Sequence, residues 1–276
     1  MKQKYADLYG VDARVFLPRL PHLKINTTYR CDRRCSNCNR ATHLCPSSRE
    51  EDISPKQISN MLEDCVKVGK SWTRITLTGG EPTMHDNFEE IVDVLMNYKK
   101  EHNPAIRIGT YTYHHPKFYY KIENVMKKYP SEINNGVYAK NNKGFEIKDT
   151  MKEKPRIHKI AYFKAPIDIE PSKYNKDHLY HGCNEGARLC GIGYDTTGFY
   201  CCPVGAAIAK IFNLNVAIKT VAELTAKRLI EQYAPLCRLC GCYAYYQANV
   251  DKDLISPTWE KAIKKYNQRI KNETRS

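Results

Sequence analysis

The first half of the chain alternates short β-forming runs with amphipathic helical runs, and this alternation restricts the fold more than any other feature of the sequence. The predicted strands cover residues 22–28, 73–80, 105–112, 135–140 and 157–165. The predicted helices of this half cover residues 54–69, 87–102 and 117–129. Strands that alternate with helices pair in parallel through right-handed crossovers, with the helices on the outside. We therefore predict an α/β fold built on a parallel sheet.

Local signals support the first of these helices. Ser54 is followed by Pro55 and has Gln57 at the third helical position, which together form a capping-box start. The apolar residues that follow mostly recur at helical spacing, and Gly69 ends the run. Cys65 is one of these apolar positions, so we expect it in the core rather than at a site.

Two motifs directly follow predicted strands. The segment "NTTYRCDRRCSNCNRATHLC" (26–45) comes at the end of the first strand, and "GGEP" (79–82) comes at the end of the second. In open parallel sheets, ligands bind at the carboxyl ends of the strands, in the loops that follow them. The position of both motifs at strand ends therefore predicts an active site there.

The pattern changes near residue 180. The segment "CNEGARLCGIGYDTTGFYCCP" (183–203) predicts a β-hairpin with "DTTG" as its turn and cysteines at its base. Thr220 and Glu223 predict a capping box for a helix over 220–234, and a last helix is predicted over 257–271. We therefore predict two domains, which would cover residues 1–180 and 181–276.

Composition narrows the class of protein. No run approaches the roughly 18 consecutive apolar residues of a membrane helix, and the N-terminus lacks the apolar core of a secretory signal. We therefore expect a cytoplasmic protein with no membrane partner, in which the 12 cysteines more often bind metal than form disulfides. The net charge of +14 comes from scattered rather than striped lysines and arginines, so nucleic acid is not the expected partner.

Three cysteines follow the first strand at intervals of four and three residues, namely Cys31, Cys35 and Cys38. A closed structural zinc site takes four protein ligands, whereas three thiolates can hold three irons of a [4Fe–4S] cluster. The fourth iron then stays open to a chelating small molecule. The spacing thus predicts a cluster with room for a bound cofactor.

This spacing resembles the signature of the radical S-adenosylmethionine (SAM) superfamily, whose members also carry a GGEP motif after the second strand. The resemblance covers residues 22–160 and implies a partial (β/α)6 barrel. It implies that SAM chelates the open iron, and that the SAM-binding residues are Gly79, Gly80, Glu81 and Pro82. One departure is Asn37, where the family commonly has an aromatic residue near the adenine, so Tyr29 or "GTYT" (109–112) is an alternative adenine contact.

The cysteines of the last third resemble the SPASM/twitch extension of this superfamily, a hairpin plus helix that binds an auxiliary [4Fe–4S] cluster. The resemblance implies four ligands: Cys183, Cys201, Cys237 and Cys240. Cys202 is a rival of Cys201, because neighbouring residues of a strand point to opposite faces and only one of the two would fit. Only one further cysteine follows the CxxC pair, which favours the twitch form with one auxiliary cluster over the longer SPASM form.

Several alternatives remain open at this point. A zinc site could be completed by His43 or Cys45, and the C-terminal cysteines could form a zinc ribbon. The undecided cysteines are Cys45, Cys190, Cys202 and Cys242, any of which could donate a hydrogen atom in an epimerase. A proton acceptor could be His114 or His115, and Tyr111 and Tyr113 are similarly placed.

The resemblance implies that a reduced first cluster cleaves SAM to a 5′-deoxyadenosyl radical, which abstracts a hydrogen atom from the substrate. An auxiliary cluster can then accept an electron, which favours oxidation or epimerisation of a small polar, sugar-like molecule. Only about twenty residues precede the first strand, so the N-terminal recognition domain of many peptide maturases is not expected. Peptide modification is the alternative activity, and a zinc-binding or nucleic-acid-binding protein is the alternative class. The implied electron donor is a reductant such as flavodoxin or ferredoxin.

Overall fold

The computed structural model describes residues 22–113, 115–130, 144–149, 158–171, 183, 191–244, 246–248 and 250–273. Within these residues the strands form one sheet in the order β4-β3-β2-β1-β5-β6. The strands are β1 (His22–Thr28), β2 (Arg74–Gly79), β3 (Arg107–Thr112), β4 (Phe145–Asp149), β5 (Ile192–Asp195) and β6 (Gly198–Tyr200). The pairs β1–β2, β2–β3, β3–β4 and β1–β5 are parallel, and β5–β6 is antiparallel. The prediction of a mostly parallel α/β sheet is therefore confirmed.

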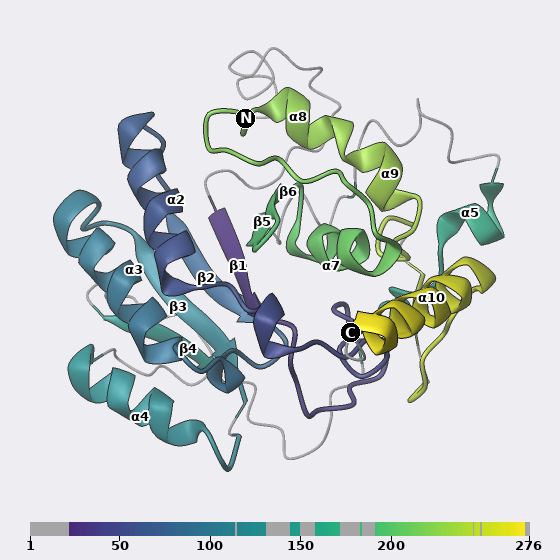
Figure 1. The fold of residues 1–276 in the computed structure, drawn as a ribbon, viewed down its shortest axis with the longest axis horizontal. Helices are drawn as coiled ribbons and strands as arrows, with labels where there is room; N and C mark the ends of the chain where they lie inside the picture. The colour runs from purple at the N-terminus through teal and green to yellow at the C-terminus, as the bar shows by residue number, and fades with distance from the viewer. Residues whose placement is uncertain are drawn as a thin grey trace.

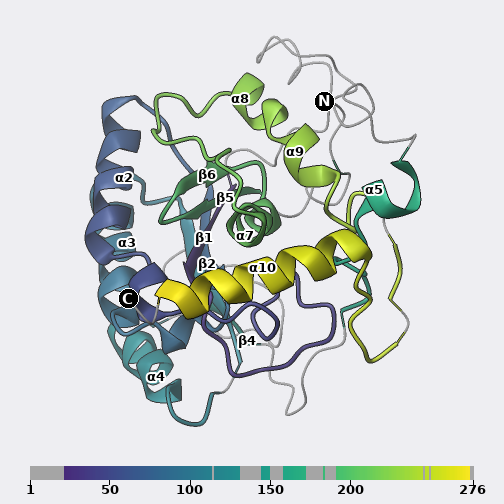
Figure 2. The same ribbon diagram turned by 45° about the vertical axis from the view of Figure 1, so that its right-hand side comes forward.

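Helices lie on both sides of this sheet. On one side are α2 (Pro55–Lys67), α3 (Phe88–His102) and α4 (Tyr119–Lys128), and Figure 1 shows them in chain order along it. On the other side are α7 (Pro203–Phe212) and α10 (Pro257–Glu273), as the turned view in Figure 2 shows. The shorter helices are η1 (Arg49–Glu51), η2 (Pro82–Met84), α5 (Pro166–Ile169), α8 (Ala226–Glu231) and α9 (Tyr233–Cys237).

The register of the parallel strands gives the sheet two different faces. One row of neighbouring residues across four strands is Leu23, Ile75, Ile108 and Phe145, all fully buried in the apolar core. The next row, on the opposite face, is Lys24, Thr76, Gly109 and Glu146. Parallel sheets usually carry apolar residues on both faces. Here one face carries polar side chains, which marks it as the face available for a site.

Helix α7 begins directly on the polar face beside β1 and β5. The Asn26 side-chain amide of β1 donates a hydrogen bond to the Pro203 carbonyl at the first turn of α7 (3.2 Å). The helix itself is almost entirely buried, since most of its residues are small or aliphatic. The start of α7 is therefore joined to the first strand.

Most expected elements are confirmed, with small shifts at their ends. The helix α2 carries the predicted capping box at Ser54, and the predicted "DTTG" turn joins β5 to β6 in an antiparallel hairpin. The expected strand over 157–165 is wrong within the described residues 158–165, where Ile160 makes only an isolated bridge to Gln247. The expected strand over 135–140 lies outside the described residues.

Strand β4 and the long helix α7 were not expected from the sequence. Strand β4 was missed because its sequence "FEIKD" alternates over only five residues. Helix α7 was missed because its apolar run lacks the polar face that identifies an amphipathic helix. The capping box of Thr220 and Glu223 is formed, but it stabilises a turn, and the helix α8 begins later with Thr225 as its N-cap.

The sheet includes strands from both sides of residue 180, since β5 pairs with β1. The division into domains at this residue, the partial barrel and the twitch identity of the hairpin stay predictions. None of the helices in the described part of the chain is both long and apolar enough to cross a membrane.

An ion triad crosses the polar face at its β2–β4 end and gives a first prediction. Glu146 accepts from Arg107 (2.6 Å) and from Arg74 (3.1 Å), and its side chain is 8% exposed. We expect Glu146→Gln to lower the free energy of unfolding by about 2 kcal/mol, because both guanidinium groups lose a charged acceptor. Urea unfolding measures the change. The matched control is Glu260→Gln, an exposed helix pair for which we expect a change below about 0.5 kcal/mol. Equal changes in the two variants would contradict the prediction.

Candidate active site at the carboxyl ends of the parallel strands

The three-cysteine loop leaves the sheet at the carboxyl end of β1. Cys31, Cys35 and Cys38 are all half-buried there. Burial, together with the nearby charges of Cys38 and Glu81, raises the pKa of the Cys31 thiol to about 12. The first and third cysteines and the carboxylate of the GGEP motif therefore lie close to one another, as the sequence predicted.

The two glycines of the GGEP motif create this closeness. A Cβ atom on Gly79 would lie 2.1 Å from the Thr28 carbonyl oxygen, and one on Gly80 would lie 2.1 Å from the Arg30 carbonyl oxygen. Gly80 N–H donates to Thr28 O (2.7 Å), and Glu81 N–H donates to Arg30 O (2.9 Å). In this structure the glycines let the end of β2 touch the backbone that starts the cysteine loop. Their first role is therefore to position the loop.

Glu81 is a buried carboxylate that joins the ends of β2 and β3. Its side chain accepts hydrogen bonds from the Thr83 amide and hydroxyl, from the Thr112 hydroxyl (2.6 Å) and from the Tyr113 amide (3.2 Å). Burial nevertheless raises its pKa to about 7. The Thr83 and Thr112 donors all bond to Oε1, so among the described residues Oε2 accepts a hydrogen bond only from the Tyr113 amide. This oxygen is the one that could also accept from a cationic ligand.

Asn37 explains why an aromatic residue is missing before the third cysteine. It has a positive φ of 52°, a conformation that asparagine adopts more readily than aromatic residues. Its side chain is fully buried, donates to Lys252 O (2.8 Å) and accepts from Leu254 N–H (3.0 Å). Its backbone N–H donates to Asp253 (2.6 Å). Asn37 therefore fastens the cysteine loop to the segment that precedes α10.

The same segment holds two further residues of the loop. The Ser36 hydroxyl donates to Asp251 (2.5 Å), and His43 pairs with Asp253 (2.6 Å). Burial acts to raise the pKa of Asp253, but the bonds from His43 and Asn37 lower it overall. Cys45, the other residue considered as a zinc ligand, is buried near the positive charges of α7 and α10.

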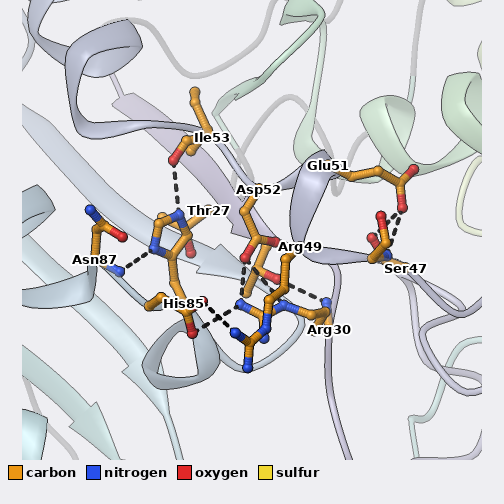
Figure 3. Close-up of polar contacts among 12 residues, drawn as sticks. Thr27, Arg30, Ser47, Arg49, Glu51, Asp52, Ile53, His85 and Asn87 are labelled. Carbon is orange, nitrogen blue, oxygen red and sulfur yellow. Dashed lines mark hydrogen bonds and ion pairs between the residues drawn. The ribbon is translucent and has the colours of Figure 1, made fainter.

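A polar network on the other side of the loop fixes its first turn (Figure 3). Arg30 donates to Asp52 from both Nε (3.1 Å) and a terminal nitrogen (2.5 Å), and it also faces Asp86. Asp86 in turn pairs with Arg49 (3.1 Å). His85 Nε2 donates to the Ile53 carbonyl (2.8 Å), as Figure 3 shows. The segment between the cysteine loop and the GGEP motif is thus bonded to the cysteine loop through Arg30, and to the residues that follow the GGEP motif through His85 and Asp86.

Asp32, between the first two cysteines, contacts the end of β3. It accepts from the Tyr113 hydroxyl and pairs with His115 Nε2 (3.0 Å), while the Arg33 guanidinium stacks on the Tyr113 ring. Both Tyr113 and His115, considered from the sequence as pocket residues, are therefore beside the cysteine loop. His114 lies outside the described residues.

The C-terminal cysteines gather in one pocket. Six cysteines line it. Four are the expected ligands Cys183, Cys201, Cys237 and Cys240, and the other two are the rival Cys202 and the undecided Cys242. The thiols of Cys183 and Cys242 are 3.8 Å apart. Cys190 lies outside the described residues. The sequence offered one signal for Cys242, its place two residues after the CxxC pair.

The expectation that Cys201 and Cys202 point to opposite faces is wrong. Strand β6 ends at Tyr200, so the two residues are in a bend rather than a strand, and both line the pocket. Cys202 is the N-cap of α7 and accepts from Gly205 N–H (3.2 Å). A hydrogen bond from the Cys201 thiol, and then this amide, lower the pKa of Cys202 to about 7.

Both cysteine groups suit a sulfur-ligated iron cluster. The donors are thiols, the ligands that iron–sulfur clusters prefer, and the second pocket holds more of them than the four that a [4Fe–4S] cluster needs. Within the described residues, no three His, Cys, Asp or Glu side chains are arranged to hold a single metal ion. A cluster differs from a single ion because it spreads its ligands over several iron atoms.

A separate cavity of about 580 Å³ opens at the carboxyl ends of β1 and β5. Its lining mixes acidic, basic and hydroxyl groups, including Tyr29, Asp195, Lys210 and Arg269. The Tyr29 hydroxyl donates to Asp195 (2.9 Å), and Lys210 pairs with Glu51 (3.1 Å). The volume suits a small molecule, and the lining suits a polar one. The hydroxyl of Tyr29, which the sequence offered as an alternative adenine contact, is thus hydrogen-bonded to Asp195.

The geometry of the first site has a counterpart among known proteins. Residues 25–134 match the family model of the radical SAM superfamily, so the chain carries a radical SAM domain. That family implies a [4Fe–4S] cluster and SAM, which the three-cysteine loop and the GGEP motif would hold.

Curated relatives match part of the same region. The GTP 3′,8-cyclase of Campylobacter curvus is 27% identical over 94 residues, which are 34% of this chain and 29% of that protein. The GTP 3′,8-cyclase of Haemophilus ducreyi is 26% identical over 96 residues, 35% of this chain and 28% of that protein. The chain therefore spans less than a third of the length of these relatives.

Two solved structures share a distant similarity. BtrN in complex with AdoMet and 2-DOIA has a TM-score of 0.45 and 15% identity, with 87% of this chain and all of that chain covered. Streptococcus suis SuiB bound to the precursor peptide SuiA has a TM-score of 0.32 and 13% identity, with 65% of this chain and 33% of that chain covered. These scores are too low to carry an argument about reaction or substrate.

The glycine contact gives a second prediction. We expect Gly80→Ala to reduce the iron bound by the three-cysteine loop, because a Cβ atom would push the Arg30 backbone and displace the loop. Iron per chain after anaerobic reconstitution measures this. Gly69→Ala is the control. Gly69 has a φ of +67°, but a Cβ atom added there would have no other atom within 4 Å. We therefore expect this variant to lose about 1 kcal/mol of stability and to bind as much iron as the wild type. Full iron in Gly80→Ala would contradict the positioning role.

His85 gives a third prediction, on pH. Its Nε2 donates to Ile53 O and its Nδ1 accepts from Asn87 N–H (3.0 Å), so the neutral ring satisfies both contacts. Burial lowers its pKa in the folded protein. As pH falls below about 6.5, the unfolded chain binds a proton that the folded one resists, and stability should fall by up to about 1.4 kcal/mol per pH unit.

The measurement is urea unfolding between pH 7.5 and pH 5 for the wild type and His85→Gln. We expect the variant to show a smaller loss of stability over this range. The control His102→Gln replaces a half-exposed histidine and should follow the wild type. A His85→Gln curve parallel to the wild type would exclude His85 as the source of the slope.

Proposed function

We propose that this protein is a radical SAM enzyme that cleaves SAM reductively and abstracts a hydrogen atom from a small polar substrate. The observation that carries the proposal is the meeting of the three-cysteine loop with the GGEP motif at the carboxyl ends of β1 and β2. When bound, the reduced cluster and SAM would supply a 5′-deoxyadenosyl radical at this edge of the sheet. A reductant of the flavodoxin or ferredoxin type would supply the electron.

The chain's own residues would bind and orient the two groups. Cys31, Cys35 and Cys38 would ligate three irons. The loop that carries them is held by Arg30 and by Asn37, from opposite ends. Glu81 would accept the ammonium group of SAM at Oε2, while its other oxygen stays bonded to Thr83 and Thr112.

The second pocket supports a net oxidation of the substrate. Four of its six thiols would ligate an auxiliary cluster, which would supply a one-electron acceptor for that oxidation. Cys183, Cys201, Cys237 and Cys240 are the expected set, with Cys202 as the rival of Cys201. A thiol left over could instead donate a hydrogen atom, which would give epimerisation.

The cavity at β1 and β5 supports the class of substrate. Its mixture of acidic, basic and hydroxyl groups would complement a hydroxylated molecule such as a sugar or cyclitol. The GTP 3′,8-cyclases are named for a nucleotide reaction, so GTP is the natural competitor in a substrate screen. Modification of a peptide is the alternative activity.

The experiment that tests the proposal counts iron and acid-labile sulfide per chain after anaerobic reconstitution. We expect about eight irons in the wild type and about four in the Cys31/Cys35/Cys38→Ala variant, since each [4Fe–4S] cluster holds four. The wild type should release 5′-deoxyadenosine and methionine when reduced with SAM, and the triple variant should not. Cys65→Ala is the matched control, because Cys65 is fully buried in the core as predicted and should keep all eight irons.

The other outcomes separate the alternatives. Four irons falling to none in the triple variant would remove the auxiliary cluster and the argument for oxidation. Zinc without iron would favour the zinc-binding or nucleic-acid-binding class and overturn the proposal.

A further inference from the structure

The cavity at the carboxyl ends of β1 and β5 is lined by two opposite charges that do not pair with each other. Asp195, at the end of β5, is only 4% exposed. Arg269, near the end of α10, is half-buried. Both line the cavity of about 580 Å³, yet no ion pair joins these two described residues. Because a buried charge needs a partner, the shared cavity indicates a ligand that bonds to both groups.

Asp195 keeps one acceptor position for such a ligand. Its Oδ1 accepts from the Thr197 amide (2.9 Å) and hydroxyl (2.6 Å), and its Oδ2 accepts from the Tyr29 hydroxyl (2.9 Å). The Arg40 guanidinium reaches it only indirectly, through Asn26 and then Tyr29. A carboxylate has about four acceptor positions, so within the described part of the chain one position at Oδ2 stays available. Asp195 can therefore accept a hydrogen bond from a ligand hydroxyl.

Arg269 supplies a positive charge to the same cavity. One terminal nitrogen donates to the Lys210 carbonyl (3.1 Å), and the guanidinium lies over the Tyr266 ring at 5.2 Å. No carboxylate among the described residues pairs with it. A guanidinium has several N–H donors in a planar fork that matches a carboxylate or a phosphate. Arg269 can therefore pair with an anionic group of the ligand.

The ammonium of Lys210 lies between these two groups. It is 4.5 Å from the centre of the Tyr29 ring, whose hydroxyl bonds to Asp195. It is also 5.2 Å from the centre of the Tyr266 ring, over which Arg269 lies. Its own charge is already used in the ion pair with η1 (3.1 Å). Lys210 thus links the two ends of the cavity, and Arg269 is the better partner for an anion.

We propose that this cavity binds a hydroxylated molecule that also carries an anionic group, either a phosphate or a carboxylate. Arg269 pairs with the anionic group, and Asp195 accepts a hydrogen bond from a hydroxyl of the same molecule. The inference rests on the proposed function, because it names a second functional group of the substrate for that same cavity. A neutral sugar would leave Arg269 without a charged partner, and a charge-assisted hydrogen bond is about twice as strong as a neutral one.

The test measures binding to the full reconstituted chain by isothermal titration calorimetry. Three probes share one carbon skeleton: D-glucose 6-phosphate, D-glucuronate and D-glucose. We expect at least one of the two anionic probes to bind at least about tenfold more tightly than D-glucose. The phosphate and carboxylate probes show which anion the cavity takes. Equal affinity for all three probes, or no binding of either anionic probe, overturns the proposal.

Two substitutions of Arg269 locate the anion. Arg269→Met keeps an apolar stem over Tyr266 and removes the charge, so we expect the preference for the anionic probe to be lost. Arg269→Lys keeps the charge and should retain most of that preference. Urea unfolding shows that each variant is folded. An unchanged preference in Arg269→Met means that the anion binds elsewhere on this basic protein, which overturns the proposal.

Lys265→Met is the matched control. Lys265 is an exposed lysine one turn earlier in α10, outside the cavity lining, so its variant should bind all three probes as the wild type does.

SAM cleavage is measured separately, with a chemical reductant and no added probe. Its absence from the wild type is a failure of the proposed function alone. Anion-selective binding that Arg269→Met abolishes supports the site whether or not SAM is cleaved.

Discussion

The contact between the backbone of Gly79–Gly80 and that of Thr28–Arg30 is the constraint on which the site depends. Any side chain at either glycine would occupy the space of a carbonyl oxygen on the neighbouring segment. The contact extends the pairing of β1 and β2 beyond the sheet, into the two loops that carry the motifs. Because those loops are joined by backbone hydrogen bonds, the cysteines of one and the carboxylate of the other have a fixed separation.

The rest of the site is built outward from this contact. Arg30, Asp52 and Asp86 hold the start of the cysteine loop on the side of the outer helices. Asn37 and Ser36 hold its far end to the segment before α10. The loop is therefore supported from both parts of the sequence, and these contacts hold its three half-buried thiols in one arrangement. The same polar face receives α7, so the second cysteine pocket forms beside the first site.

How far the sequence predicted these features depends on the range of the interactions. The first three strands, the helix that follows each of them, the capping box at Ser54 and the core position of Cys65 follow from neighbours in sequence, and these are confirmed. The relation of Cys201 to Cys202 was mispredicted, because a strand was assumed where the chain bends into α7. The contact of Cys242 with Cys183 joins residues 59 apart, and its one signal in the sequence is the place of Cys242 two residues after the CxxC pair.

The sequence by itself was enough to predict the class of chemistry, because ligand type and spacing within one loop are local properties. Three thiols at intervals of four and three residues, followed by a Gly-Gly-Glu-Pro at the next strand end, were sufficient for that. Only the tertiary structure decided which residues support the site. Asn37 and Glu81 have their roles through partners far away in sequence, and burial makes their polar groups need those partners.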